Sequence, residues 1–262
     1  MNPIVDAQPP SMTVAGAIAR IELRRPKHAN RLESTDLATL LGFFAELSAN
    51  PQVRVVVLQG QGRYFSAGYD LGQVAEIAAA KTEGTIENPF EALVEGLEAL
   101  PQVTIARLHG GVYGGSTDLA LACDFRVGTP NTEMFMPAAA LGLLYYPSGV
   151  KRFVSRLGIN EAKRLFLLGE KTNASEMLRI GFLTDLVAED ALDERVDHLA
   201  QRAASLAPLA LRETKRAMNA LARDEFDLAD FKAWEARLLR SSDLREGLAA
   251  WKEKRDASFT GQ

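Results

Sequence analysis

The stretch "VRVVVLQGQGRYFSAGYDL", residues 53–71, joins an apolar run to a loop that contains very small residues. The run over 53–60 is short and largely apolar, which predicts a strand that is covered on both faces. Ala67 and Gly68 follow it between aromatic residues, and glycine serves where φ is positive or where a ligand approaches the main chain. We therefore expect backbone N–H groups at this strand end to face a ligand.

A second stretch, "VTIARLHGGVYGGSTDLALACDF" at 103–125, repeats the pattern. A strand-like run ends in two glycines, and Gly114 and Gly115 then precede a helix. Backbone N–H groups at a helix N-terminus form a site for negative charge. Either loop alone is weak evidence, because glycine-rich turns between strands and helices are common. Together, the two loops suggest an oxyanion hole for one oxygen that becomes anionic during a reaction.

Composition narrows the class of protein. The chain has 262 residues, 47% of them hydrophobic, which suffices for a substantial core. Its formal net charge of −4 gives no electrostatic case for a nucleic-acid or membrane-surface partner. No apolar run approaches the roughly 18 residues of a membrane span, and the N-terminus does not read as a signal peptide. The single cysteine, Cys123, reads as a buried structural thiol, so we expect a cytoplasmic location.

The order of the expected elements indicates an α/β fold. Strands are predicted over 17–26, 53–60 and 102–110, and helices over 34–50, 72–84 and 89–101, the first capped by Ser34 or Thr35. From about residue 147 onward the pattern is helical. We expect an α/β core over 1–195 and a helical C-terminal region over 196–262.

Five segments resemble, in order, the signature segments of the crotonase family, also called the enoyl-CoA hydratase/isomerase family. They are "IELRRPKHANRL" (21–32), "FSAGYDL" (65–71), "GGVYGGSTDLALACDFRV" (110–127), "MPAAALGLLYYPSGVKRFVSRLG" (136–158) and "SSDLREGLAAWKEKR" (241–255). The resemblance implies a crotonase-like spiral of repeated β-β-α units with a helical C-terminal trimerisation region. It also implies an acyl-CoA substrate, no bound cofactor besides that coenzyme A, and a homotrimer or a dimer of trimers.

The resemblance also assigns residues to the site. It places the thioester oxygen between the backbone N–H groups of Tyr69 and Gly115. The other positions that it brings to the CoA thioester are Lys27, Ala29, Ala67, Gly68, Gly114, Ala138, Tyr145 and Tyr146. The acyl pocket is expected from loops such as 73–90 and 131–147.

The acids depart from the family pattern. Hydratases of the family use two glutamates, and the first position falls here on Asp118 and the second on Ala138. Alanine cannot move a proton, so efficient two-acid hydration is not expected. One carboxylate can still carry a proton between the α- and γ-carbons, which is isomerisation. Tyr145 and Tyr146 are read as pocket packing rather than acid chemistry, with a second proton donor as the alternative.

Other interpretations stay open at this point. Asp118 also fits a helix N-terminal acid stabilised by the helix dipole. A non-catalytic CoA-thioester-binding trimer, an acyl-CoA hydrolase and a decarboxylase are the alternatives within the fold. A serine nucleophile at Ser116 with His109 and Asp118 lacks the G-x-S-x-G elbow, and His109 is more typical of a hydrogen-bonded structural residue. No residue spacing indicates a metal site.

Overall fold

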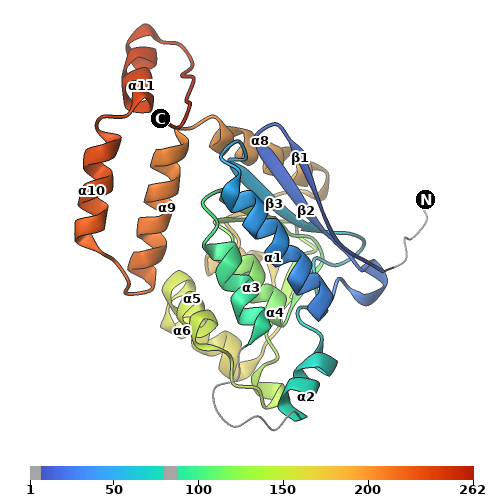
Figure 1. The fold of residues 1–262 in the computed structure, drawn as a ribbon. Helices are drawn as coiled ribbons and strands as arrows, with labels where there is room; N and C mark the ends of the chain where they lie inside the picture. The colour runs from blue at the N-terminus through green and yellow to red at the C-terminus, as the bar shows by residue number, and fades with distance from the viewer. Residues whose placement is uncertain (1–6, 80–87) are drawn as a thin grey trace.

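A computed structural model of the chain describes residues 7–79 and 88–262. Within these ranges a six-stranded sheet has the order β1-β2-β3-β4-β6-β9 (Figure 1). The strands are β1 (Gln8–Ala15), β2 (Ile18–Arg24), β3 (Val55–Gly60), β4 (Val103–Arg107), β6 (Phe125–Gly128) and β9 (Asp185–Leu186). β1 pairs with β2 antiparallel, and every other pair in this sheet is parallel.

A smaller sheet lies beside the large one and has the order β5-β7-β8. Its strands are β5 (Gly111–Tyr113), β7 (Glu133–Phe135) and β8 (Thr172–Asn173). The chain passes from β4 in the large sheet to β5 in the small sheet and then into helix α4, and it repeats the two-sheet step from β6 to β7. Two isolated parallel bridges extend this pairing to earlier parts of the chain. Ser66 pairs with Val112 of β5, and Leu32 pairs with Tyr69. The predicted α/β fold of repeated β-β-α units is confirmed.

The core occupies both faces of the large sheet because β3 alternates its side chains. Val56 and Leu58 lie in the apolar cluster that contains the buried hydrophobic residues of α1, α3 and α4. Val55 and Val57 lie in a second cluster, with Val196 and other residues of α8. A strand buried on both faces explains the continuous apolar run that the sequence displays.

The helices of the core are α1 (Ser34–Ala49), α2 (Leu71–Ala79), α3 (Pro89–Glu98), α4 (Gly115–Ala122), α5 (Pro147–Leu157), α6 (Ile159–Lys163), α7 (Ala174–Arg179) and α8 (Leu192–Ala204). After them come α9 (Pro208–Ala222), α10 (Leu228–Leu238) and α11 (Ser242–Glu253), which extend away from the sheet (Figure 1). The predicted boundary at 195/196 falls inside α8, which packs on the sheet. The division into two regions stays a prediction.

The expected strands over 17–26, 53–60 and 102–110 are confirmed as β2, β3 and β4, and the expected helices over 34–50 and 89–101 as α1 and α3. The helix expected over 72–84 is seen as α2, and its part beyond residue 79 lies outside the described residues. The predicted cap of α1 at Ser34 or Thr35 is wrong. Glu33 is the N-cap, because its side chain and that of Asp36 form a reciprocal capping box with the backbone.

Candidate active site

The two glycine loops meet main chain to main chain. Gly68 has a φ of +84°, and a Cβ built on it would lie 2.6 Å from the backbone N of Gly115 and 2.8 Å from the carbonyl oxygen of Tyr113. No side chain fits into such a gap, so glycine is required at position 68. The loop that follows β3 is thereby held against the first residue of α4.

Two backbone donors at this contact have no protein acceptor. Within the described ranges, neither the N–H of Tyr69 nor that of Gly115 donates a hydrogen bond to the protein. The N–H of Gly115 is free because it opens α4, whose N-cap, Gly114, has no side chain to offer it an oxygen. Unpaired N–H groups on neighbouring segments are the geometry that binds a negatively charged oxygen.

The loop that follows β2 is hydrogen-bonded to the loop that contains Gly68. The N–H of Ala67 donates to the carbonyl oxygen of Ala29 at 2.7 Å, and the N–H of Leu32 donates to that of Gly68 at 2.8 Å. Ala29 and Ala67, which sequence reasoning assigned to CoA, therefore lie side by side. Lys27 lies on the exposed surface of the short 3₁₀ turn that precedes Ala29. Contact of these residues with CoA stays a prediction.

Asp118 lies in the first turn of α4 and has no exposed surface. Nη1 of Arg152, from α5, donates to both of its carboxylate oxygens at 2.7 Å. The hydroxyl of Tyr146 donates to Oδ2 at 2.5 Å. Complete burial raises the pKa of Asp118. The charge of Arg152 and the hydrogen bonds from Arg152 and Tyr146 oppose that rise.

Arg152 connects Asp118 to a second buried acid, Glu98, at the end of α3. Its Nε and Nη2 donate to the Glu98 carboxylate at 3.1 and 3.2 Å. Arg156 and Arg223 also reach Glu98, at 2.9 and 3.3 Å. Burial acts to raise the pKa of Glu98, but the arginine charges outweigh it and lower that pKa below its ordinary value. For Arg152, burial acts to lower the pKa, and the two carboxylates outweigh it and raise that pKa.

A continuous set of aromatic rings links the Asp118 cluster to the glycine loops. The rings of Tyr145 and Tyr146 stack with centroids 4.2 Å apart, and Phe90 lies 6.3 Å from Tyr146. Phe90 in turn stacks on Tyr69 at 5.7 Å. A Cβ built on Gly115 would lie 2.7 Å from the Phe90 ring, so the ring covers the start of α4. These rings form an apolar surface beside the free N–H groups.

Ala138 lies at the N-cap of a 3₁₀ turn, Ala139–Leu141, and is 4% exposed. It belongs to the same buried cluster as Tyr146. A buried methyl group therefore occupies the position to which the resemblance assigned the second acid. Residues 80–87, within the predicted pocket loop 73–90, lie outside the described part of the chain.

The serine-nucleophile hypothesis is wrong. The Ser116 hydroxyl donates to the carbonyl oxygens of Ser66 and Tyr113, at 2.6 and 2.8 Å. His109 bonds the carbonyl oxygen of Gly62 through Nε2 and faces Arg107 through Nδ1, so it does not act on Ser116. Burial lowers the pKa of His109, which fits a neutral structural imidazole as expected.

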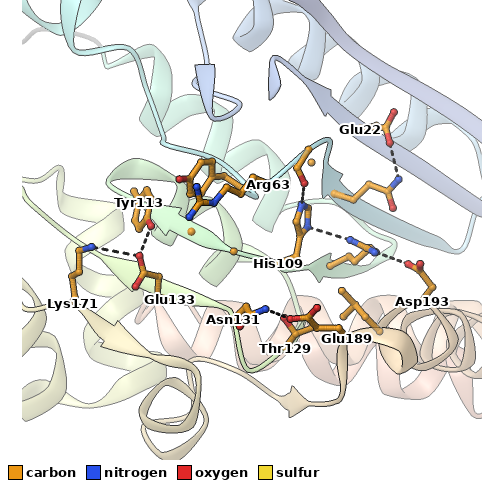
Figure 2. A pocket seen from close by; sticks show the side chains of 18 residues that line it. Glu22, Arg63, His109, Tyr113, Thr129, Asn131, Glu133, Lys171, Glu189 and Asp193 are labelled. Carbon is orange, nitrogen blue, oxygen red and sulfur yellow. Dashed lines mark hydrogen bonds and ion pairs between the residues drawn. The ribbon is translucent and has the colours of Figure 1, made fainter. Parts of the chain in front are cut away.

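His109 lines a separate polar cavity of about 1070 Å³, at the ends of β3 and β4 (Figure 2). Its charged groups are mostly paired: Figure 2 shows Glu133 between Tyr113 and Lys171, and Asp193 bonded to an arginine, which is Arg107. None of the residues assigned to thioester binding lines it. Sequence reasoning did not identify this cavity.

Sequence reasoning assigned no role to Arg152 or Glu98. A signal for Arg152 was present, because the buried positions of α5 are Gly149, Arg152, Phe153 and Leu157, which follow the helical period. An arginine on the buried stripe of a helix needs buried acceptors, of which a carboxylate is the strongest. The identity of that partner was not readable, because Asp118 is distant in the sequence.

The described ranges hold neither a metal-binding cluster nor a membrane-spanning helix. No group of three or more histidine, cysteine, aspartate or glutamate side chains is arranged to hold a metal ion. Across the same ranges, no helix has the length and hydropathy needed to cross a bilayer.

Comparisons with known proteins show the family to which the chain belongs. The model of the family described as enoyl-CoA hydratase/isomerase matches residues 13–262. Human "Enoyl-CoA hydratase domain-containing protein 2, mitochondrial" is 33% identical, over 94% of this chain and 86% of its own. "Carnitinyl-CoA dehydratase" of Proteus mirabilis is 32% identical, over 96% and 98%. The crystal structure of an enoyl-CoA hydratase from Bacillus anthracis superposes with a TM-score of 0.85 at 29% identity, covering 97% of this chain and all of that one.

Proposed function

This chain belongs to the enoyl-CoA hydratase/isomerase family, and on that premise we propose that it is an acyl-CoA enzyme acting through a thioester enolate. The observation that carries the proposal is the contact of Gly68 with Gly115, beside two backbone N–H groups that have no protein acceptor. In the proposal, the N–H groups of Tyr69 and Gly115 donate to the thioester oxygen. They stabilise the negative charge that develops when a proton leaves the α-carbon.

The proposed reaction uses one carboxylate, that of Asp118. Hydration needs one group to activate water and another to deliver a proton, and Ala138 stands where the resemblance puts the second acid. Removal of an α-proton from a 3-enoyl thioester gives a dienolate, and return of the proton to the γ-carbon gives the 2-enoyl isomer. Double-bond isomerisation therefore fits these residues better than efficient hydration.

The substrate supplies its own coenzyme A, and the proposal needs no other cofactor. Main-chain donors take the charge of the enolate, and the aromatic wall from Tyr69 to Tyr145 receives the acyl chain. We also propose a homotrimer or a dimer of trimers assembled through α9, α10 and α11, in the cytoplasm. Large apolar side chains exposed on these helices, such as Leu228 and Trp251, support that assembly. Light scattering on the purified chain measures it.

The first experiment incubates the purified chain with a 2-enoyl, a 3-enoyl and a 3-hydroxyacyl CoA thioester. Products are separated by chromatography, and their masses are measured by mass spectrometry. A double-bond isomer of unchanged mass is the expected product. A gain of one water on the 2-enoyl thioester would contradict the single-carboxylate mechanism, and release of free CoA would indicate a hydrolase instead.

The Asp118→Asn variant tests the carboxylate. We expect turnover to fall by at least about 100-fold, the usual range for a lost acid–base group, with CoA-thioester binding retained. Asp36→Asn is the matched control, because Asp36 is also a buried first-turn acid and accepts from Arg25 at 2.7 Å. It should lose stability and keep turnover. Turnover that survives Asp118→Asn would exclude this acid from the chemistry.

A second candidate is a CoA-thioester-binding protein without catalysis. The observation that favours it is that both oxygens of Asp118 are already engaged by Arg152 and Tyr146. Binding of the thioesters without any change in mass, double-bond position or isotope content would support it.

A further inference from the structure

The carboxylate of Asp118 has no open side from which to reach a substrate. Its side chain has no exposed surface, Arg152 occupies both oxygens, and Tyr146 occupies Oδ2 as well. A group that exchanges a proton with carbon must approach that carbon closely. If Asp118 is the acid–base group, something must carry the proton between it and the substrate.

Two tyrosine hydroxyls form a chain that ends on this carboxylate. The hydroxyl of Tyr145 donates to the hydroxyl oxygen of Tyr146 at 3.1 Å, and that of Tyr146 donates to Asp118 Oδ2 at 2.5 Å. Both donations run toward the carboxylate. Across the described residues, no protein group donates to the hydroxyl oxygen of Tyr145, so this oxygen is the open end of the chain. As whole residues, Tyr145 is half-buried and Tyr146 is buried.

We propose that the Tyr145 hydroxyl is the catalytic group that contacts the reacting carbon, and that Tyr146 relays the proton between it and Asp118. The inference rests on the proposed function and deepens it. In the forward step, the C–H bond at the α-carbon breaks, its electron pair forms the enolate, and the proton goes to the oxygen of Tyr145. The Tyr145 proton passes to Tyr146, and the Tyr146 proton passes to Asp118. The reverse sequence returns a proton to the α- or the γ-carbon.

The charges balance at both ends of this sequence. Both phenols are neutral before and after the step, and the negative charge moves from Asp118 to the enolate oxygen at Tyr69 and Gly115. Burial, with the Asp118 charge, raises the pKa of both tyrosines well above 10.0, which keeps them protonated at neutral pH. Burial also raises the pKa of Asp118, which helps this carboxylate to accept a proton.

Arg152 is a positioning residue in this scheme. It holds Asp118 by Nη1 and is held in turn by Glu98 through Nε and Nη2. Three anchored nitrogens fix the plane of its guanidinium, and that plane fixes the orientation of the carboxylate toward Tyr146. The aromatic contacts from Tyr146 through Phe90 to Tyr69 then bring the relay to the wall of the proposed acyl pocket.

Deuterium exchange tests the relay separately from the whole reaction. A 3-enoyl-CoA thioester is incubated at saturating concentration in D₂O with the full-length chain, and deuterium in the recovered thioester and its isomer is measured by mass spectrometry. The Tyr145→Phe and Tyr146→Phe variants should each lower the exchange rate by about 100-fold or more. The Kd for the CoA thioester should change by less than about threefold. Tyr64→Phe, which removes a hydroxyl beside the polar cavity, is the control and should exchange at the unaltered rate.

The outcomes separate the two proposals. Exchange by Tyr145→Phe at the unaltered rate overturns the relay and leaves the proposed function intact. A change confined to binding, with normal exchange at saturation, also overturns it, because it shows that Tyr145 only shapes the pocket. If the unaltered protein neither exchanges deuterium nor shifts the double bond, the proposed function is overturned and the relay with it. If Tyr146→Phe fails to fold, because Asp118 loses a buried donor, the Tyr145→Phe result decides.

Discussion

Replacing Gly68 by alanine tests the backbone contact on which the proposed site depends. The new Cβ would lie 2.6 Å from the Gly115 nitrogen and 2.8 Å from the Tyr113 carbonyl oxygen, and both are main-chain atoms that cannot rotate away. The strand β5 and the start of α4 would have to move. Gly16 supplies the matched control, because its φ is +58° and a Cβ there would have no neighbour within 4 Å.

The magnitudes follow from these two environments. A positive φ costs an alanine about 1 kcal/mol at either position. Overlap with fixed atoms adds about 1–3 kcal/mol at position 68. We therefore expect the free energy of unfolding to fall by about 2–4 kcal/mol for Gly68→Ala and by about 1 kcal/mol for Gly16→Ala. Urea denaturation with an unchanged m-value measures the difference.

Activity should separate the two variants more strongly than stability does. Displacing one donor of an oxyanion hole typically lowers the catalytic rate about 100- to 1000-fold. The Gly68→Ala variant should lose isomerisation by that factor under conditions in which it is folded, and Gly16→Ala should keep it. If the two variants were equal in both stability and turnover, the close approach of the two loops would be refuted as a requirement of the site.

Two further predictions concern buried groups. Arg152→Leu should lower the free energy of unfolding by about 3–5 kcal/mol, because it leaves Asp118 as an uncompensated buried charge, and a loss below about 1 kcal/mol in urea denaturation would contradict the network. Burial raises the pKa of the Cys123 thiol from 9.0 to about 12, so the native protein should resist thiol reagents at pH 8 and react after unfolding. Because the thiol of the unfolded chain ionises first, its contribution to stability is complete below pH 9 and is lost as pH rises toward 12, at up to about 1.4 kcal/mol per pH unit. Cys123→Ala should remove that part of the slope, and an unchanged slope would contradict the assignment.

Local patterns predicted much of the fold. The apolar run before Gly60 indicated a strand covered on both faces, and β3 is one. β1 was not predicted, because Pro9 and Pro10 argue against a strand. The structure tolerates them because β1 is an edge strand whose register shifts between Gln8 and Ser11. Proline costs a strand little where its missing N–H would face away from the sheet.

The site was predictable where it depends on the main chain and less so where it depends on tertiary contacts. Gly68 and Gly115 were predicted as site residues because they are glycines that follow the ends of predicted strands. The engagement of Asp118 by Arg152 did not, because a pairing across 34 residues leaves no local pattern. The π-helical turn at Arg164–Leu168, which brings Phe166 to within 5.2 Å of the Tyr145 ring, likewise has no signal in an ordinary helical sequence.

The use of backbone donors determines which positions of the site tolerate substitution. The donor at position 69 is a peptide N–H, which every residue except proline carries. A substitution of the Tyr69 side chain by any residue other than proline therefore keeps this donor. The intolerance belongs instead to its neighbour, since only glycine lets the two loops touch at position 68. A saturation mutagenesis screen for function should therefore mark Gly68 as nearly immutable, whereas position 69 should exclude proline and accept other large apolar side chains that can stack on Phe90. In such a site, the glycine between the two loops tolerates fewer substitutions than the residue whose backbone N–H acts as the donor.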